Sequence, residues 1–305
     1  MANWKSLRRS LIGDNPASCL PPRVKLPVLP HAALEFSKKS QDPNVAVEEL
    51  GDIIETDSGL TCDLLRHVNS SAFGLRRKIS SAKHAVVALS VHQCRLFLLE
   101  NCLEKAFKQY RSEFIDPWEF AAVNLERALF AQEVAILFKA DTSLAFTAGM
   151  LVDFVLPMVT LHLGHAYSKY VDLPDDEQTS LAKFEEANLG WDHAHAAAQV
   201  MLQWGFPDDL ICCVLLHHRG FSLIGDKVLS GTAANAVAIA SCLPDPLNQT
   251  PHGLDMLIEL DRRWEKFDLK AISEKVSVQY EEMKSPQTEH KPIFHQLRTR
   301  ELSRS

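Results

Sequence analysis

The chain has 305 residues, and its 32 Lys and Arg side chains against 39 Asp and Glu side chains give a formal net charge of −7. This acidic balance argues against binding of DNA or RNA and against attachment to anionic lipid, because both need a basic surface. The seven cysteines include no CxxC pair. They therefore argue against a Cys-rich zinc site and are typical of reduced thiols in a cytoplasmic protein.

The chain begins without a regular pattern. Residues 1–23 contain one glycine and three prolines with little periodicity, and no apolar run follows the basic residues as it would in a signal peptide. We expect an irregular segment here. Helical periodicity begins at residue 24 and continues along most of the chain.

The next part of the chain predicts four helices. One covers Val47–Thr56, with Ala46 at the position where a capping side chain is preferred. Asp57 caps the second, and Ser80 or Ser81 caps the third. A long fourth helix covers Val91–Tyr110.

The second half is also helical. Pro117 occupies a first-turn position of an amphipathic segment. The apolar stretch Leu144–Leu163 contains Asp153 and Pro157, so it predicts a core helix, a break and another helix instead of a membrane span. Further helices are expected over the following ranges: 184–204, 208–218, 230–243 and 254–283. With no strand alternation, the predicted fold class is all-α.

Histidines and one buried carboxylate suggest a metal site. Asp153 lies in an apolar helix, His193 opens the stretch WDHAHAAAQVMLQW, and His217 and His218 end a buried helix. One carboxylate and two or three imidazoles from separate helices can bind a divalent ion. A core aspartate that only hydrogen-bonds a histidine is the alternative. Neighbouring helical residues point about 100° apart, so we expect only one of the adjacent pair to face inward.

A short basic cluster, Arg76-Arg77-Lys78, offers a second candidate site. Three positive side chains together can contact the phosphate of a small anionic ligand. A solvated loop is the alternative interpretation.

Several motifs follow one another in order along residues 24–243. They are LPVLP, Asp42-Pro43, IIETDSGLTCDLLRHVNSSAFG, ISSAKHAVVALS, WDHAHAAAQVMLQWGFP and LLHH. Together they resemble the HDOD family. The resemblance implies a multi-helix bundle related to HD-type metal phosphohydrolases, used by bacteria as a signalling or regulatory module. On this resemblance, the matched region divides into a helical part at 24–112 and an HD-like part at 113–243. We expect a helical extension at 244–284 and a mobile tail at 285–305.

The departures from the HD phosphohydrolase pattern bear on activity. The resemblance places Val152 where the His of the His-Asp dyad belongs, Glu126 near the first His and Asn235 at the late Asp. Ser90 replaces a usual glycine. Because valine cannot ligate and asparagine is a weak neutral ligand, a two-metal hydrolase is not expected. One zinc, manganese or iron ion held by Asp153, His193 and one of His217 or His218 stays open, beside an empty polar pocket.

The sequence therefore predicts a non-enzymatic signal-transduction module. It would act in the cytoplasm by binding a signalling protein or a small anionic ligand. The alternative is a one-metal phosphohydrolase or phosphodiesterase that acts on a nucleotide or phosphoester, with Asp153 as a metal ligand and a histidine as general acid or base.

Overall fold

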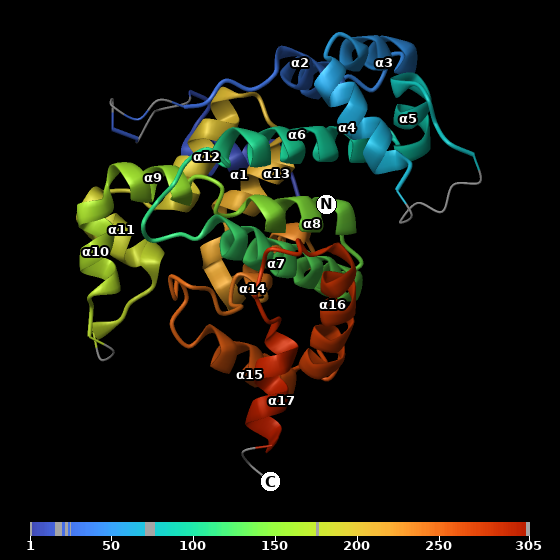
Figure 1. Cartoon of the computed structure of the whole chain (residues 1–305). Coiled ribbons are helices and arrows are strands. Elements are labelled where there is room, and N and C mark those ends of the chain that lie inside the picture. Colours follow the sequence, from blue (N-terminus) through green and yellow to red (C-terminus); the bar gives the residue numbers. More distant parts are fainter. Residues whose placement is uncertain are drawn as a thin grey trace. The chain divides into compact units, whose positions relative to one another are not determined.

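The computed structural model describes residues 2–15, 20–21, 24, 26–70, 77–174 and 177–302 (Figure 1). The described residues form helices joined by turns and contain no strand, which confirms the all-α prediction. The chain divides into two compact units. The first comprises Met1–Val24, Tyr110–Val200 and Asp208–Ser305, and the second comprises Lys25–Gln109 and Met201–Pro207.

Among the residues that the structure describes, five helices lie wholly within the second unit. They are α2 (His31–Lys39), α3 (Val47–Glu55), α4 (Ser58–Val68), α5 (Ala82–Leu89) and α6 (Val91–Phe107). Asp57 caps α4 by accepting the Leu60 N–H at 3.0 Å, and the Ser81 hydroxyl accepts the His84 N–H at 3.3 Å. The predicted helix starts are therefore confirmed, including the uncapped start of α3 after Ala46.

Asn69, the first residue of the NSSAFG motif, has a structural role. Its Nδ2 donates to the carbonyl oxygens of Leu65 at 2.8 Å and Ile79 at 2.7 Å, and its Oδ1 accepts the Ile79 N–H at 2.8 Å. This side chain therefore joins the end of α4 to the chain that enters α5. In the basic cluster, Arg77 and Lys78 are exposed, and Arg76 lies outside the described residues.

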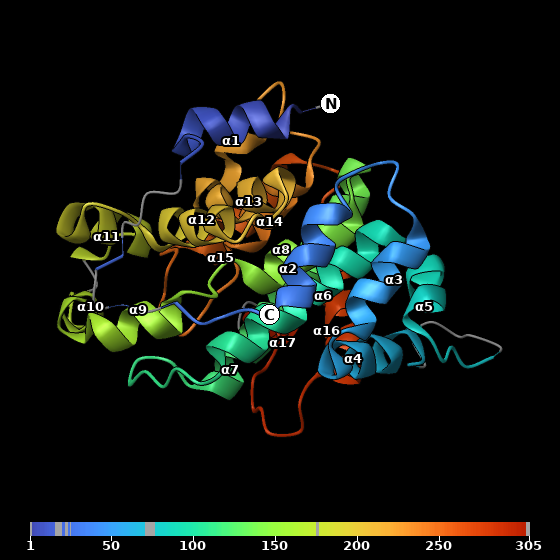
Figure 2. The same ribbon diagram turned by 90° about the horizontal axis from the view of Figure 1, so that it is seen from above.

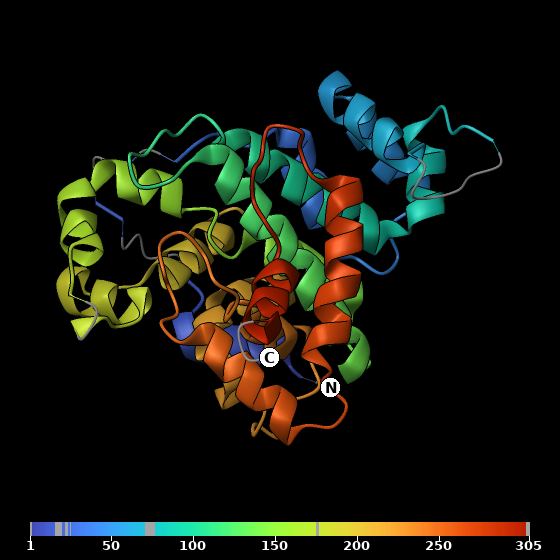
Figure 3. The same cartoon turned by 60° about the horizontal axis from the view of Figure 1, so that its bottom comes forward.

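The first unit is built around one long helix (Figures 1 and 3). Its elements are α1 (Trp4–Ile12), α7 (Pro117–Phe138), α8 (Thr142–Leu151), α9 (Leu156–His162), α10 (Gly164–Val171), α11 (Leu181–Leu189), α12 (His193–Gln203, ending in the second unit), α13 (Asp208–Leu215), the 3₁₀ helix η3 (His217–Leu223), α14 (Ala233–Ala240), α15 (Gly253–Arg263), α16 (Leu269–Met283) and α17 (Ile293–Leu302). Helices α8, α14 and α16 pack against α7.

Two residues explain how α7 starts and how closely α8 approaches it. The Asp116 carboxylate caps α7 by accepting the Glu119 N–H at 2.8 Å. Pro117 is the first residue of the helix, a position that the fixed φ of proline favours. A Cβ atom on Gly149 would lie 2.6 Å from the Ala128 Cα, so α8 can approach this closely only with glycine there.

The prediction that the apolar stretch Leu144–Leu163 forms core helices with a break between them is confirmed. Helices α8 and α9 follow each other across a break before Pro157. Together, Thr142–His162 is long and apolar enough to cross a membrane, but 83% of its most apolar window is buried inside the protein. The bent pair Ala82–Leu89 and Val91–Phe107 passes the same length and composition test with a 112° angle between its helices.

Several predicted helix limits were wrong. The range 254–283 contains two helices, α15 and α16, and the helix expected at 208–218 ends at Leu215. The segment 184–204 contains two helices, because Gly190 ends α11 with φ +80° and the Asp192 carboxylate then caps α12 by accepting the His195 N–H at 2.6 Å. The start of the chain is not irregular, since residues 4–12 form α1. Its Arg8, 5% exposed, pairs with Asp14 just after α1 and with Asp208 of α13, and the second pair holds α1 against α13 (Figure 2).

The backbone at Ser90 has a conformation that favours glycine. Ser90 caps α6 with φ 72° and ψ 155°, a conformation that non-glycine residues adopt at a cost of about 1–3 kcal/mol. Its hydroxyl accepts the Gln93 N–H at a long 3.4 Å. The strained backbone therefore outweighs the contribution of the cap.

We predict that Ser90→Gly stabilises the protein by about 1 kcal/mol, since relief of strain exceeds the loss of a weak cap and the added entropy of the unfolded chain. Chemical denaturation measures the change. Ser81→Gly is the matched control, because Ser81 caps α5 with an ordinary φ of −134° and should lose a few tenths of a kcal/mol. Equal destabilisation by both substitutions would contradict the account.

Candidate metal-binding site

The four residues expected to bind a metal lie together in the first unit. Asp153 is in the break between α8 and α9, His193 is the first residue of α12, and His217 and His218 begin η3. Asp153 and His193 are fully buried, His217 is 1% exposed, and His218 is half-buried. Access from solvent is therefore greatest beside His218.

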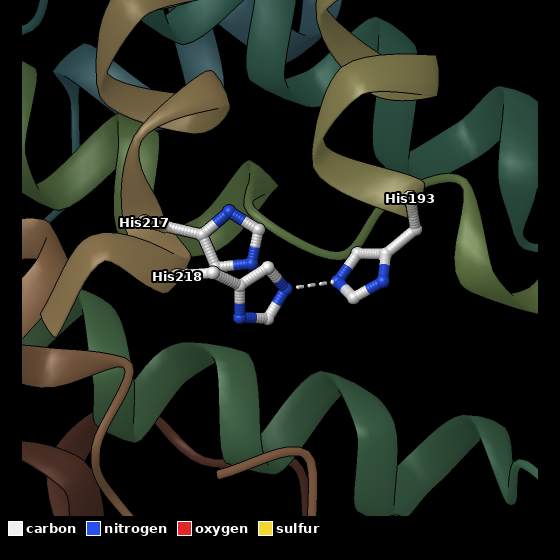
Figure 4. Close-up of side chains that lie close together, drawn as sticks. All are labelled: His193, His217 and His218. Carbon is white, nitrogen blue, oxygen red and sulfur yellow. Dashed lines mark hydrogen bonds between the residues drawn. The ribbon is translucent and has the colours of Figure 1, made fainter. Parts of the chain in front are cut away.

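The three imidazole rings converge (Figure 4). One nitrogen from each ring lies within 4.8 Å of the others, and the Nε2 atoms of His193 and His218 are 2.7 Å apart. The expectation that only one of the adjacent histidines faces inward was wrong. Helix α13 ends at Leu215, so His217 and His218 do not follow one α-helical surface.

Hydrogen bonds fix how two of the rings present their nitrogens. The Nδ1 atom of His193 lies 2.6 Å from the Glu185 carboxylate, and that of His217 lies 2.6 Å from the Val214 carbonyl oxygen. Both oxygens only accept, so each Nδ1 carries a proton. In its neutral form each ring therefore directs the Nε2 lone pair toward the site, as a metal ligand requires.

Glu185 anchors His193 in this orientation. The buried carboxylate accepts the Tyr167 hydroxyl at 2.5 Å and the His193 backbone N–H at 2.8 Å, in addition to the ring. The backbone bond exists because Gly190 ends α11 and leaves the first N–H of α12 available. A carboxylate that orients a ligating histidine is a common feature of metal sites.

The two oxygens of Asp153 have different environments. Oδ2 accepts hydrogen bonds from Arg127 and, at 2.8 Å, from Gln249 Nε2. Oδ1 lies 3.4 Å from His193 Nε2 and 3.5 Å from His217 Nε2 without a hydrogen bond of normal geometry. His217 Nε2 is likewise buried and unpartnered. Buried polar atoms without partners are costly, so both fit an ion at this point.

Arg127 supplies a fixed positive charge beside the histidines. Its side chain is 2% exposed, and its guanidinium pairs with Asp153 and lies 3.2 Å from Asp245 Oδ2. Burial raises the pKa of Asp153, but the Arg127 charge and the two histidines outweigh this effect and hold it well below the usual range. Asp153 is therefore ionised inside the protein core.

The carboxylates also control the protonation of the histidines. Burial lowers the pKa of His193, but Glu185 and Asp153 outweigh burial and raise it to about 10. Burial, followed by the neighbouring His217 and His193, depresses the pKa of His218 well below its usual value. Without a metal, the proton between the Nε2 atoms of His193 and His218 therefore lies on His193. A metal bound at His193 Nε2 would displace this proton.

The site also contains residues that the sequence analysis missed. The first-His position was placed at Glu126, but the next residue, Arg127, faces the site. A charged residue inside the buried helix 117–138 was the available signal. Gln249 and Asp245 come from the chain after residue 243, where no motif pointed to them. Asn235 is buried and its Nδ2 donates to the Ser230 carbonyl oxygen at 2.8 Å.

Comparison with known proteins establishes the class of protein to which this fold and site belong. A model of the HDOD domain family matches residues 26–220, so the chain belongs to the HDOD family.

Solved structures share the fold. An HDOD domain protein of unknown function from Geobacter sulfurreducens is 21% identical, with 83% of this chain and 93% of that chain covered and a TM-score of 0.57. A protein from Shewanella amazonensis named "Putative metal-dependent phosphohydrolase" is 14% identical, with 88% and 91% covered and a TM-score of 0.55.

Among curated proteins, an uncharacterised protein of Treponema pallidum is 21% identical over 200 residues, which cover 64% of this chain. The match covers only 38% of that relative's length.

The ion pair at the site should be essential for stability. We predict that Arg127→Met lowers the free energy of unfolding by about 3–5 kcal/mol, because it leaves Asp153 and Asp245 buried without their countercharge. Equilibrium denaturation measures the loss. The matched control is Arg263→Met, which breaks an exposed pair with Glu259 and should cost less than about 0.5 kcal/mol. Equal effects of the two substitutions would contradict this role of Arg127.

Proposed function

We propose that this HDOD protein is a non-enzymatic signalling module whose HD-type centre accommodates at most one metal ion. The observation that carries this proposal is the buried pairing of Arg127 with Asp153. Two-metal hydrolysis requires two cations about 3.5–4 Å apart with a nucleophilic water between them. Here a guanidinium occupies one side of the aspartate, and guanidinium has no lone pair to offer a metal.

Electrostatics opposes a second ion at that side. A divalent cation about 4 Å from the Arg127 charge would be repelled by about 8 kcal/mol at an effective dielectric constant near 20. Val152, which is fully buried and has no ligand atom, contributes nothing to offset this repulsion. The arrangement thus supports the loss of two-metal chemistry that the sequence predicted.

The remaining donors fit one ion. Three imidazole nitrogens and the free oxygen of Asp153 make a nitrogen-rich set that suits zinc, manganese or iron. Such an ion would link α12, η3 and the turn at Asp153. In this role the metal stabilises the module, and the module signals through contact with a protein partner or a small anionic ligand.

A one-metal phosphohydrolase is the second candidate function. The unpartnered Asp153 Oδ1 and the half-buried position of His218 favour it, because an ion there would have an accessible side. Such an ion polarises a phosphoryl oxygen or lowers the pKa of a bound water. His218 would then be the residue placed to transfer a proton. The printed name of the Shewanella relative is consistent with this alternative.

An activity assay separates the two candidates. Purified protein is loaded with Mn²⁺, Fe²⁺ or Zn²⁺ and given bis(p-nitrophenyl) phosphate and a cyclic dinucleotide. We expect hydrolysis no faster than that of His218→Ala. Multiple turnovers that disappear in His218→Ala, with an unchanged circular dichroism spectrum, would refute the non-enzymatic proposal.

Metal titration tests the one-ion site. We expect at most one ion per chain by elemental analysis. If an ion binds, Glu185→Gln should weaken its affinity about 10–100-fold by disturbing the orientation of His193. The adjacent, exposed Glu186→Gln is the control and should leave the affinity unchanged. Two ions per chain, or equal affinities in both variants, would contradict this description of the site.

A further inference from the structure

A histidine from the C-terminal part of the chain lies between two carboxylates of α7. His290 Nδ1 is 2.9 Å from Glu119 Oε1, and its Nε2 is 2.7 Å from Glu126 Oε2. Carboxylate oxygens only accept hydrogen bonds, so both ring nitrogens must carry protons. His290 is therefore an imidazolium that bridges positions 119 and 126 of one helix.

Glu126 depends on this segment for its hydrogen bonds. Its side chain is 5% exposed, and besides His290 it accepts the backbone N–H of Ile293 at 2.6 Å. Ile293 is 1% exposed, so its side chain is buried as well. An ionised carboxylate at this depth is costly without its partners. The segment is thus held by charge and by apolar burial at neighbouring positions.

This arrangement differs from the prediction of a mobile tail at 285–305 in the part that the structure describes, residues 285–302. Figure 3 shows the chain turning back after α16, so that the segment before α17 runs beside α7. These residues lie beyond the part matched by the HDOD family model, which ends at residue 220. The inference drawn from this contact is therefore separate from the proposed function of the metal-binding site.

We infer that residues 285–297 form a C-terminal strap that docks on α7 through the doubly hydrogen-bonded imidazolium of His290 and is released when this ring loses a proton. A neutral ring has one donor nitrogen and one acceptor nitrogen. It cannot donate to both carboxylates, so one of its two contacts becomes repulsive. Release would expose Glu119 and Glu126 on α7 to solvent.

The groups that face His290 set the direction of the pH response. They are Glu119 and Glu126 from α7 and the ring of Tyr280 from α16, whose centroid is 5.6 Å away. Its sequence neighbours Glu289 and Lys291 are exposed.

Burial lowers the pKa of His290, but the two carboxylates outweigh burial and raise it above its usual value of about 6.5. A raised folded-state pKa stabilises docking fully below that usual value, and the stabilisation disappears as pH rises through the folded-state pKa.

Hydrogen exchange of the strap tests this inference on the full-length protein. The protection factor of peptides containing Ile293 is measured by mass spectrometry from pH 6 to pH 9, after correction for the intrinsic exchange rate. We expect protection in the wild type to fall about tenfold across this range, as a charge-assisted hydrogen bond is lost. In His290→Gln it should be low at pH 6 and independent of pH. Peptides from α14 provide the internal control.

A second variant retains the histidine and keeps the test decisive. Glu119→Gln removes one carboxylate, so the loss of protection should shift to lower pH than in the wild type. Wild-type protection that stays constant from pH 6 to pH 9 would overturn the inference. The inference would also be overturned if the protection of His290→Gln fell with pH as it does in the wild type, because another group would then control docking.

Discussion

The buried ion pair between Arg127 and Asp153 determines what the centre of this protein can do. It keeps Asp153 ionised in the core and uses one of its two oxygens, leaving the other for the histidines or for a single ion. Because the guanidinium also lies beside Asp245, the positive charge is balanced from two sides. The pair thus stabilises a polar core around Asp153, and the proposal that this site holds at most one ion depends on it.

Helix α7 connects this core to the part of the chain outside the family match. Adjacent helical residues project about 100° apart, so Arg127 faces the site while Glu126 faces the C-terminal strap. About two turns further along α7, the Glu133 carboxylate accepts a hydrogen bond from Lys275 of α16 at 2.6 Å. The same helix therefore holds the candidate site on one side and anchors C-terminal residues on another.

Local sequence signals predicted much of the fold, but the long-range polar contacts could not be predicted from them. Asp57, Ser81 and Pro117 marked helix starts because capping acts over three or four residues. The motifs also identified the four site residues that the structure brings together. Arg127 and His290 were missed because their partners, Asp153 and Glu126, lie 26 and 164 residues away in the sequence. Periodicity carries no information about such pairs.

The number of cations that the site holds and the position of the Arg127 guanidinium together decide whether two-metal chemistry is possible here. Anomalous diffraction from crystals soaked in Mn²⁺ measures both. We expect at most one manganese peak, bound by His193, His217 and His218, with the Arg127 guanidinium still on Asp153. Two manganese peaks about 3.5–4 Å apart, with Arg127 displaced from the aspartate, would contradict this expectation.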